Sequence, residues 1–372
     1  MPKKFRIAIF AGPSGGHLYP ALAVAEAFLD ANPENEITFV TSEKGRKFVP
    51  ERFNERFKAI FYLHNFPFPG FFTFRLIPFL IKLCQAIVRT WVIIKQSKPD
   101  VCIGFGSYAS FPGVLISWWQ RIPVIIHEQN YRYGKATKSL INFTNIVTGS
   151  FEKTVEDGQK VPYVHVGLPL RRQLLKNALK RRAECSTATD GKVKILVVGG
   201  SQGASRINEL VLGAFERLSN EEKDKIAVKH ITGKNDFLRC QARYKQLNMQ
   251  FETYDFVNDI ENHYSNADVV ISRAGSATLF ELAAFSLPAI VIPYPHAQAH
   301  QNENANFFSE RNAIICKDEK SLDETQMKHL ILELVADKAK REQLSKSIAG
   351  LGRLDASERF VAMTRNLIQE SL

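Results

Sequence analysis

The stretch Val193-Lys194-Ile195-Leu196-Val197-Val198-Gly199-Gly200-Ser201-Gln202-Gly203 joins a run of apolar residues to a glycine-rich loop. Residues 6–10, followed by the loop at residues 12–17, repeat this design near the start of the chain. A helix-like sequence comes after each loop, at residues 207–218 and 21–29. Such a combination forms an anion site, because glycines let the backbone approach a phosphate and the helix dipole attracts negative charge. Two copies predict two domains that face each other across a cleft and serve a reaction between two phosphate-bearing molecules.

The rest of the chain alternates strand and helix patterns, which indicates parallel sheets. We predict strands at residues 6–10, 37–41, 101–104, 124–127 and 146–148, and helices at 21–29, 76–95 and 111–119. In the second half we predict strands at residues 193–198, 227–231, 269–272 and 289–292. The fold class is therefore α/β, with two Rossmann-like doubly wound domains. We expect the domains at residues 1–170 and 192–350, a polar connection at 171–191, and a C-terminal helix within 351–372 that returns to the first domain.

Composition narrows the choice of partners and environment. The chain has 372 residues, a net charge of +11 and a pI near 9.3, which favours an anionic partner. The basic residues are spread out and no nucleic-acid-binding motif occurs, so we expect no nucleic acid partner. The five cysteines lack Cys-x-x-Cys spacing, which suits a reducing cytosol and gives no metal site. The short apolar run after Lys3 and Lys4 is typical of a first strand rather than a signal peptide.

Polar residues follow two predicted strands of the first half. His17 ends the first glycine loop, where an imidazole can act as a base near neutral pH or can simply bond to the helix backbone. His127, Glu128, Gln129 and Asn130 follow residues 124–126 and form either a site or a capped turn. A dinucleotide-binding fingerprint is a weaker alternative, because the glycine spacing is not G-x-G-x-x-G. Glu43 keeps that alternative open, since it follows the second strand and could bind a ribose.

Two further segments follow predicted strands of the second half. Residues 272–281 place small side chains before a helix, which leaves backbone amides open to a phosphate, and Glu281 could accept hydrogen bonds from a ribose diol. The alternative is a tight turn with a solvated glutamate. Residues 293–305 are rich in amide and imidazole groups, which suits either sugar recognition or a capped helix start. His296 and His300 are spaced like a helical metal pair, but no nearby carboxylate completes a metal site.

In this order, the segments resemble the two-domain GT-B glycosyltransferases, and within them family 28, which includes the enzymes that convert lipid I to lipid II. The resemblance spans most of the chain. It rests on residues 14–17, 104–108, 127–130, 199–204, 273–281 and 293–301.

The resemblance implies an inverting enzyme that moves GlcNAc from UDP-GlcNAc to the MurNAc 4-hydroxyl of lipid I (undecaprenyl-pyrophosphoryl-MurNAc-pentapeptide) without a cofactor or metal. His17 is our first candidate for the general base, and Glu128 is the second. The implied UDP-GlcNAc-binding residues are Ser14, Gly15, Gly16, Asn130, Arg171, Ser201, Val257, Ser276, Ala277, Thr278, Leu279, Phe280, Glu281 and Gln301. The implied acceptor pyrophosphate residues are Gly15, Gly16, Gly106, Ser107 and Tyr108. The implied location is the cytoplasmic face of the plasma membrane.

The chain departs from the family pattern at four places. The family usually has Gly-Gly-Thr at residues 12–14 and Gly-Gly-Tyr at 106–108, where this chain has Pro13, Ser14 and Ser107. It has Asn at the position of Leu168 and Gln at the position of His300. Leu168 removes an amide near Arg171, and the phosphate loops stay usable.

Residues 57–99 contain no acidic residue but many basic and aromatic ones. Prolines, Gly70 and recurring bases interrupt every stretch that could span a membrane, so we expect no spanning helix. Basic residues beside aromatics suit an interfacial segment on anionic lipid, and the alternative is an ordinary helix with a solvated basic face. The lipid-linked acceptor favours the membrane. The candidate membrane residues are Phe71, Phe72, Arg75, Phe79, Lys82, Arg89 and Trp91.

Three rival functions remain for this chain. One is another GT-B glycosyltransferase that acts on a different glycolipid. The others are a nicotinamide-dependent oxidoreductase and a nucleotide-sugar-binding protein that has lost its chemistry.

Overall fold

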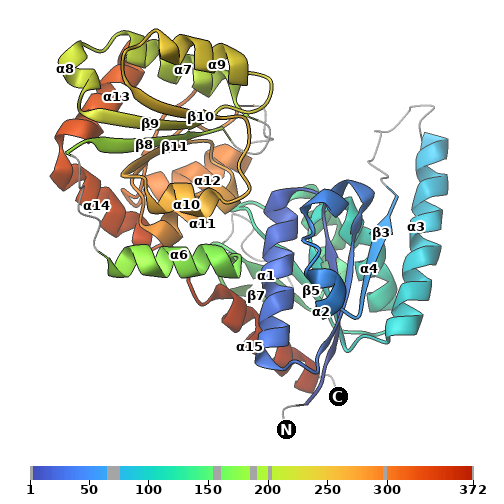
Figure 1. The fold of residues 1–372 in the computed structure, drawn as a ribbon. Helices are drawn as coiled ribbons and strands as arrows, with labels where there is room; N and C mark the ends of the chain where they lie inside the picture. Colours follow the sequence, from blue (N-terminus) through green and yellow to red (C-terminus); the bar gives the residue numbers. More distant parts are fainter. Residues whose placement is uncertain are drawn as a thin grey trace. The chain divides into compact units, whose positions relative to one another are not determined.

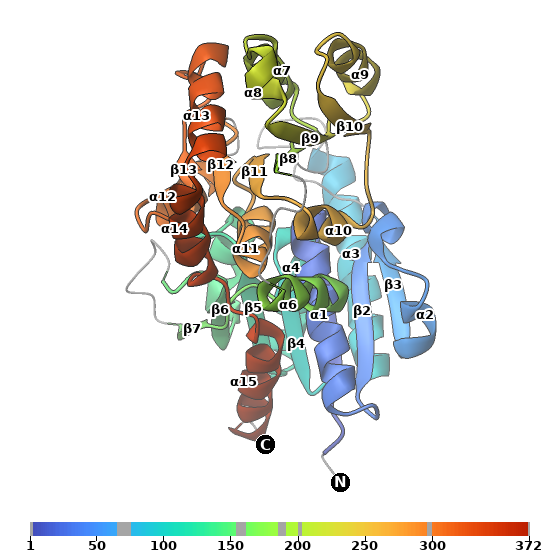
Figure 2. The same cartoon turned by 60° about the vertical axis from the view of Figure 1, so that its left-hand side comes forward.

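The computed structural model describes residues 3–64, 76–153, 161–184, 191–199, 203–295 and 300–370. The chain forms two compact units, which are coloured by sequence in Figure 1 and seen from a second direction in Figure 2. Unit 1 comprises Met1–Arg171 and Leu354–Leu372, and unit 2 comprises Arg172–Arg353.

Unit 1 is built on a parallel sheet whose described strands have the order β3-β2-β1-β4-β5-β6-β7. The strands are β1 (Arg6–Ala11), β2 (Glu36–Ser42), β3 (Ala59–Leu63), β4 (Val101–Phe105), β5 (Val124–Glu128), β6 (Ile146–Gly149) and β7 (Tyr163–His165). Its helices are α1 (Gly15–Ala31), η1 (Glu43–Phe48), α2 (Phe53–Arg56), α3 (Leu76–Ser97), α4 (Ser107–Trp119), α5 (Lys135–Leu140), η2 (Ile141–Phe143) and α15 (Ala356–Glu370).

Alternate residues of the central strands enter two cores on opposite faces of this sheet. Ile7 and Ile9 pack in one core with α1 and α15, to which Phe360 contributes. Ala8 and Phe10 pack in the other with α3 and α4. Helix α15 therefore belongs to unit 1, although it is the last element of the chain.

Unit 2 is built on a second parallel sheet, whose described strands have the order β10-β9-β8-β11-β12-β13. The strands are β8 (Val193–Val198), β9 (Ile226–Ile231), β10 (Gln250–Tyr254), β11 (Val269–Ser272), β12 (Ala289–Val291) and β13 (Ile315–Cys316). Its helices are α6 (Arg172–Ala183), α7 (Ser205–Glu216), α8 (Asn220–Lys223), α9 (Phe237–Lys245), α10 (Ile260–Ser265), α11 (Ser276–Phe285), α12 (His300–Ser309), α13 (Glu324–Ala336) and α14 (Lys338–Ala349). Helices α7, α9 and α13 contribute to the core on one face.

Both sheets are doubly wound, which confirms the predicted α/β class. In each sheet the strand order reverses between the first strand and the fourth, which are β1 and β4 in unit 1 and β8 and β11 in unit 2. Ligands of such sheets bind beyond the carboxyl ends of the strands at this reversal. The glycine loops follow β1 and β8, so they lie where a ligand site is expected.

Two segments differ from our expectation. We predicted a glycine loop at residues 12–17 and a helix at 21–29, yet α1 begins at Gly15, because burial of Leu18, Ala21 and Leu22 outweighs the low helix propensity of glycine and proline. We also expected residues 171–191 to be a polar connection, but α6 packs on α10 and α11 within unit 2.

The basic residues of α6 explain why it is a helix of unit 2. Arg181 donates to the carbonyl oxygens of Ser265 and Phe285, and Arg182 donates to those of Ala283 and Ala284. These carbonyls lie at the C-terminal ends of α10 and α11, where the helix dipole favours cations. The charges that made the segment resemble a linker therefore anchor it.

Candidate active site

Three loops of unit 1 meet beside Gly106, at the carboxyl ends of β1, β4 and β5. A Cβ placed on Gly12 would lie 2.5 Å from the Cβ of Ser107. A Cβ placed on Gly106 would lie 3.1 Å from His17 Nε2 and 3.8 Å from Gln129 Oε1. Gly106 also has a φ of +67°, which glycine adopts at little cost. The missing side chain at Gly106 thus lets the imidazole of His17 pack closely against the Gly106 backbone, and the carboxamide of Gln129 lies beside them.

The N-termini of α1 and α4 lie beside Gly106. No side chain caps either helix, and neither has an acidic residue in its first turn. Gly15 and Gly16 form the start of α1, and Ser107 and Tyr108 form the start of α4. The first amide groups of a helix have no partner within the helix and attract anions. This arrangement can bind a phosphate group.

His17 lies in the first turn of α1, and Ser14 holds its ring. Ser14 Oγ and His17 Nδ1 are 2.8 Å apart. Burial lowers the pKa of His17, and the nearby carboxylate of Glu128 opposes that shift. The ring is therefore neutral near pH 7. When Nδ1 donates its proton to Ser14 Oγ, the lone pair is on Nε2, the atom beside Gly106, which is the state that a general base requires.

Both carboxylate oxygens of Glu128 accept hydrogen bonds from residues that follow it in the chain. Its Oε1 accepts hydrogen bonds from the backbone N–H and the side-chain amide of Asn130, at 3.0 and 3.1 Å. Its Oε2 accepts from the Gly134 N–H at 2.9 Å and from the Thr137 hydroxyl at 2.6 Å. A buried carboxylate with these partners holds the loop after β5 and orients Asn130. Its geometry does not suit our second candidate role, that of general base.

His127 supports the same loop from beneath. Its Nδ1 lies 3.1 Å from Thr148 Oγ1 and its Nε2 lies 3.3 Å from Ser150 Oγ. Burial, with a smaller contribution from the nearby His17, lowers the pKa of His127 to about 3. His127 is therefore a neutral residue of the interior, below the surface of the site.

Arg171 ends the part of the chain that belongs to unit 1 before the chain enters α6. Its guanidinium lies 4.6 Å from the ring centre of Tyr19, which is a cation–π contact to α1. Leu168, which stands where the family has Asn, is buried. Arg171 is thus held against the helix that carries His17.

Gly199 and Gly203, which lie at the two ends of the loop after β8 in unit 2, have no room for a side chain. A Cβ on Gly199 would lie 2.5 Å from the Ala204 backbone nitrogen. Gly203 has a φ of +77°, and a Cβ there would lie 2.7 Å from the Thr232 carbonyl oxygen. Ser201, our candidate in this loop, lies outside the described residues.

Helix α11 begins beside this loop, at the carboxyl end of β11. Gly275 is its N-cap, and no side chain caps the helix or brings an acid to its first turn. Ser276, Ala277 and Thr278 form that first turn. The side chains of Leu279 and Phe280, which we also predicted to contact the ligand, are buried in the interior. The site at α11 consists of backbone amides and small side chains.

Glu281 lies one turn further along α11 and is held from below. The hydroxyl of the buried Tyr264 donates to Glu281 Oε2 at 3.2 Å. Val257 lies half-buried in the segment between β10 and α10.

Gln301, in the first turn of α12, joins two loops of unit 2. Its Oε1 accepts from the N–H groups of Ala274 and Tyr294, at 3.2 and 2.9 Å. The carbonyl end of Gln301 thus has a structural role, which leaves the NH₂ group as the part that can contact a sugar.

Comparison with known proteins identifies the family. Residues 7–148 match the model of the glycosyltransferase family 28 N-terminal domain, and residues 194–360 match the model of the family 28 C-terminal domain. The chain belongs to glycosyltransferase family 28.

Similar proteins cover nearly the whole chain. A protein of Coxiella burnetii (strain RSA 493 / Nine Mile phase I) is 33% identical over 361 residues, 97% of this chain and 98% of its own. It is named UDP-N-acetylglucosamine--N-acetylmuramyl-(pentapeptide) pyrophosphoryl-undecaprenol N-acetylglucosamine transferase. A Geotalea uraniireducens protein of the same name is 33% identical over 364 residues, with coverage of 97% and 98%. The structure is similar to that of Acinetobacter baumannii MurG, with a TM-score of 0.76, 24% identity and coverage of 98% and 100%.

Membership of family 28 confirms the predicted resemblance and the GT-B fold. It also makes the protein a transferase, so the nicotinamide-dependent alternative is wrong. Two residues beside the candidate sites, Gln129 and Tyr264, had no assigned role in the sequence. Gln129 lay within a segment that we had singled out, and its position after β5 was the signal that could have found it. Tyr264 had no such signal, because a single aromatic residue in a polar stretch does not predict a partner.

Helix α3 of this family-28 enzyme presents an exposed apolar surface. By length and composition, Ile77–Ser97 could cross a membrane, which corrects our expectation that every such stretch is interrupted. Pro67, Pro69 and Gly70 precede the helix in the sequence, and Pro78 lies in its first turn. Near its C-terminal end, Ile93 and Ile94 are buried in the core of unit 1, so that end packs on the domain. Figure 1 shows α3 on the outside of unit 1.

The candidate membrane residues fall into three groups. Lys82, Arg89 and Trp91 are exposed on α3, and Phe79 is half-buried. Phe71, Phe72 and Arg75 lie outside the described residues. Large exposed apolar side chains lie on α3 and on the C-terminal end of α4: Ile77, Leu80, Ile81, Val88, Trp118 and Trp119.

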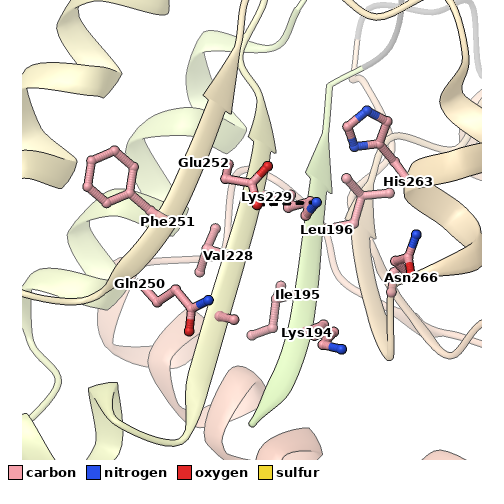
Figure 3. A pocket seen from close by; sticks show the side chains of 12 residues that line it. Lys194, Ile195, Leu196, Val228, Lys229, Gln250, Phe251, Glu252, His263 and Asn266 are labelled. Carbon is pink, nitrogen blue, oxygen red and sulfur yellow. Dashed lines mark ion pairs between the residues drawn. The ribbon is translucent and has the colours of Figure 1, made fainter. Parts of the chain in front are cut away.

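A groove of about 300 Å³ in unit 2 lies away from the glycine loops (Figure 3). Strands β8, β9 and β10 form its floor, and His263 and Asn266 lie at one side. Lys229 and Glu252 form an ion pair within it, with Nζ and Oε1 3.2 Å apart. The groove lies on the face of the sheet rather than at the carboxyl ends of the strands, so it is separate from the site at α11.

Proposed function

We propose that this family-28 enzyme transfers GlcNAc from UDP-GlcNAc to the MurNAc 4-hydroxyl of lipid I, which gives lipid II for peptidoglycan. The observation that carries the proposal is the near-full-length similarity, at 33% identity, to enzymes named for this transfer. The geometry of the loops fits two diphosphate-bearing substrates, because each unit has a glycine loop beside an uncapped helix N-terminus.

We assign the donor to unit 2. The N-terminus of α11 suits the diphosphate of UDP-GlcNAc, because its amides stabilise negative charge on the departing UDP. In this proposal Glu281, to which Tyr264 donates a hydrogen bond, accepts two hydrogen bonds from the ribose diol. Val257, Gln301 and Ser201 are further proposed donor residues. From unit 1 we keep Ser14, Gly15, Gly16, Asn130 and Arg171 as proposed contacts of UDP-GlcNAc.

We assign the acceptor and the proton transfer to unit 1. The starts of α1 and α4 suit the acceptor diphosphate, through Gly15, Gly16, Gly106, Ser107 and Tyr108. The MurNAc hydroxyl attacks the anomeric carbon of GlcNAc while the bond from that carbon to UDP breaks. The electron pair leaves with UDP, the hydroxyl proton passes to His17 Nε2, and the configuration inverts. No metal or cofactor enters this scheme.

We propose that the exposed surface of α3 and α4 lies on the cytoplasmic face of the plasma membrane. Lys82 and Arg89 are one helical repeat of seven residues apart, so they share a face beside exposed apolar residues. Basic groups attract anionic lipid, and aromatic and aliphatic side chains enter the headgroup region. A lipid-linked acceptor requires such a position.

Mixing the purified protein with UDP-GlcNAc and a lipid I analogue tests the proposal. GlcNAc transfer that releases UDP in equal amount is the expected result. Binding of UDP-GlcNAc without transfer to any acceptor would instead identify a nucleotide-sugar-binding protein. Transfer to a different glycolipid would retain the family and overturn the acceptor.

A further inference from the structure

The side chain of Gln129 is buried at the site in unit 1, yet its amide nitrogen has no hydrogen-bond partner. Only 2% of the residue is exposed, and Nε2 is among the buried nitrogen atoms that no group of the structure contacts by a hydrogen bond. Leaving such a group unpaired costs about 1–3 kcal/mol. Native proteins rarely retain this cost without a ligand or water that provides the missing acceptor.

The surroundings of Gln129 indicate what kind of acceptor is missing. Its Oε1 would lie 3.8 Å from a Cβ on Gly106, so the carboxamide lies beside Gly106 and His17. The N-termini of α1 and α4 begin at the same place without an acidic residue in their first turns. The neighbouring carboxylate of Glu128 has both oxygens occupied by Asn130, Gly134 and Thr137. An unpaired donor near two helix N-termini favours an anionic oxygen.

We propose that Gln129 Nε2 donates a hydrogen bond to a diphosphate oxygen of the acceptor, which makes Gln129 a specificity-determining residue of the transfer. This inference rests on the proposed function, because that function makes the acceptor a diphosphate. A neutral amide suits the position beside His17. A lysine or arginine there would disfavour the proton that His17 must receive, whereas an amide donates without adding charge.

Two substitutions of Gln129 test the proposal by which of them raises the acceptor KM more. Gln129→Met keeps the size and removes the donor, so KM for the lipid I analogue should rise about tenfold while KM for UDP-GlcNAc stays unchanged. Gln129→Glu keeps the shape and adds a negative charge, so it should raise the acceptor KM further than Gln129→Met does. If the ligand group were a hydroxyl, the carboxylate of Gln129→Glu would accept a hydrogen bond and the rank would reverse, which would overturn the proposal.

Inorganic pyrophosphate identifies the part of the acceptor that is bound. It should compete with the lipid I analogue at saturating UDP-GlcNAc, and its inhibition constant should rise in Gln129→Met by about the same factor as the acceptor KM. An inhibition constant that stays at the wild-type value would overturn the diphosphate assignment.

Thermal unfolding separates this role from a structural one. Because Nε2 is unpaired, the ligand-free Gln129→Met variant should unfold at the wild-type temperature or higher, and a clear decrease would show a partner within the protein and overturn the proposal. Gln120→Met is the matched control, because Gln120 Nε2 is also buried without a partner but lies at the other end of α4. It should leave both KM values unchanged. Failure of the wild type to transfer GlcNAc would overturn the proposed function, and pyrophosphate binding by calorimetry would then still test Gln129.

Discussion

The two glycine loops of this enzyme follow equivalent strands, but their surroundings differ. In unit 1 the loop after β1 has His17, Glu128 and the buried Gln129 around it. In unit 2 the candidate site combines the loop after β8 with the backbone amides at the start of α11, which follows β11, and with the carboxylate of Glu281. The same strand–loop–helix design therefore suits an anion in both units, and in unit 1 it also carries His17, our candidate for the base. The difference favours proton transfer on the side of unit 1.

Buried histidines show what distinguishes such a base. His127 in unit 1 and His230 in unit 2 both have a pKa lowered to about 3 by burial. Both nitrogens of His230 have partners, in Tyr244 and Asn208. His17 has Ser14 at one nitrogen, and its other nitrogen lies beside Gly106. Burial lowers the pKa of all three rings, and the nitrogen beside Gly106 makes His17 the candidate base.

The largest effect should come from His17→Ala. A positioned base contributes about 10²–10⁴-fold, so kcat should fall by about that factor while affinity for UDP-GlcNAc stays nearly unchanged. Because burial lowers the pKa of His17, the wild-type rate should decrease with acid only below about pH 6.5, where the base becomes protonated. Steady-state kinetics and a pH profile of kcat measure both effects.

Ser14→Ala is the control for His17→Ala, because it removes the group that orients the ring and should cost less than loss of the ring itself. A decrease in kcat below about tenfold for His17→Ala would show that His17 is structural or binds phosphate, and proton transfer would belong to another residue.

The second effect tests the donor side. Glu281→Ala should weaken UDP-GlcNAc binding by about 1–3 kcal/mol, or about 5- to 150-fold, because it leaves the ribose hydroxyls without their acceptor. Tyr264→Phe should weaken binding less, because it removes only the hydroxyl that holds Glu281. Calorimetric titration measures both. In the double variant, Tyr264→Phe should add nothing to Glu281→Ala, and unchanged affinity in a folded Glu281→Ala protein would remove the ribose assignment.

The sequence predicted the central parts of both sheets and the sites after their first strands. Strands β1, β8 and β11 carry continuous apolar runs, which make them recognisable. The edge strands β3, β7, β10 and β13 were not predicted, because each is short and half of its residues or more face solvent or a loop.

Side-chain pairing in the site was less predictable than its location. The segment that contains Glu128 was identified as a candidate site, but the four hydrogen bonds that occupy its carboxylate come from residues up to nine positions away. The pairing of Tyr264 with Glu281 spans 17 positions and two helices. Contacts of this kind depend on the packed fold, and a local pattern does not contain them.

The third effect concerns the surface of α3 and α4 in unit 1 that we propose to bind the membrane. Reversing two charges, Lys82→Glu with Arg89→Glu, should weaken binding to anionic vesicles by about tenfold or more at low salt, since each basic group contributes about 1 kcal/mol. Activity on a soluble, short-chain acceptor should survive. The matched control reverses two exposed lysines of unit 2, Lys225 and Lys245, and should change vesicle binding little. Equal loss in both double variants would indicate a general charge effect, and vesicle binding at the wild-type level in the unit 1 variant would contradict the assignment of α3.

The smallest effect concerns backbone strain at Ser107, where unit 1 differs from unit 2. Ser107 has a φ of +66°, a conformation that costs a residue with a side chain about 1–2 kcal/mol. In unit 2 the residue with a positive φ in the loop after β8 is a glycine, Gly203. Ser107→Gly removes the strain but adds flexibility to the unfolded chain, which offsets about 0.4–1 kcal/mol. We therefore expect a net gain of roughly 0.5–1 kcal/mol, which corresponds to an increase in Tm of about 2 °C.

Kinetics of the same variant show whether the strain serves the reaction. The Cβ of Ser107 lies 2.5 Å from the position of a Cβ on Gly12, so Ser107 packs on the loop that leads to His17. A higher Tm with a lower kcat would mean that this packing positions the loop and that the strain is retained for catalysis. A higher Tm with unchanged kcat would mean that the serine is merely tolerated. The reverse change in unit 2, Gly203→Ser, should lower Tm, because its Cβ would lie 2.7 Å from the Thr232 carbonyl oxygen. If Ser107→Gly leaves Tm unchanged or lowers it, contact with Gly12 outweighs the backbone strain, and the two loops are equally relaxed.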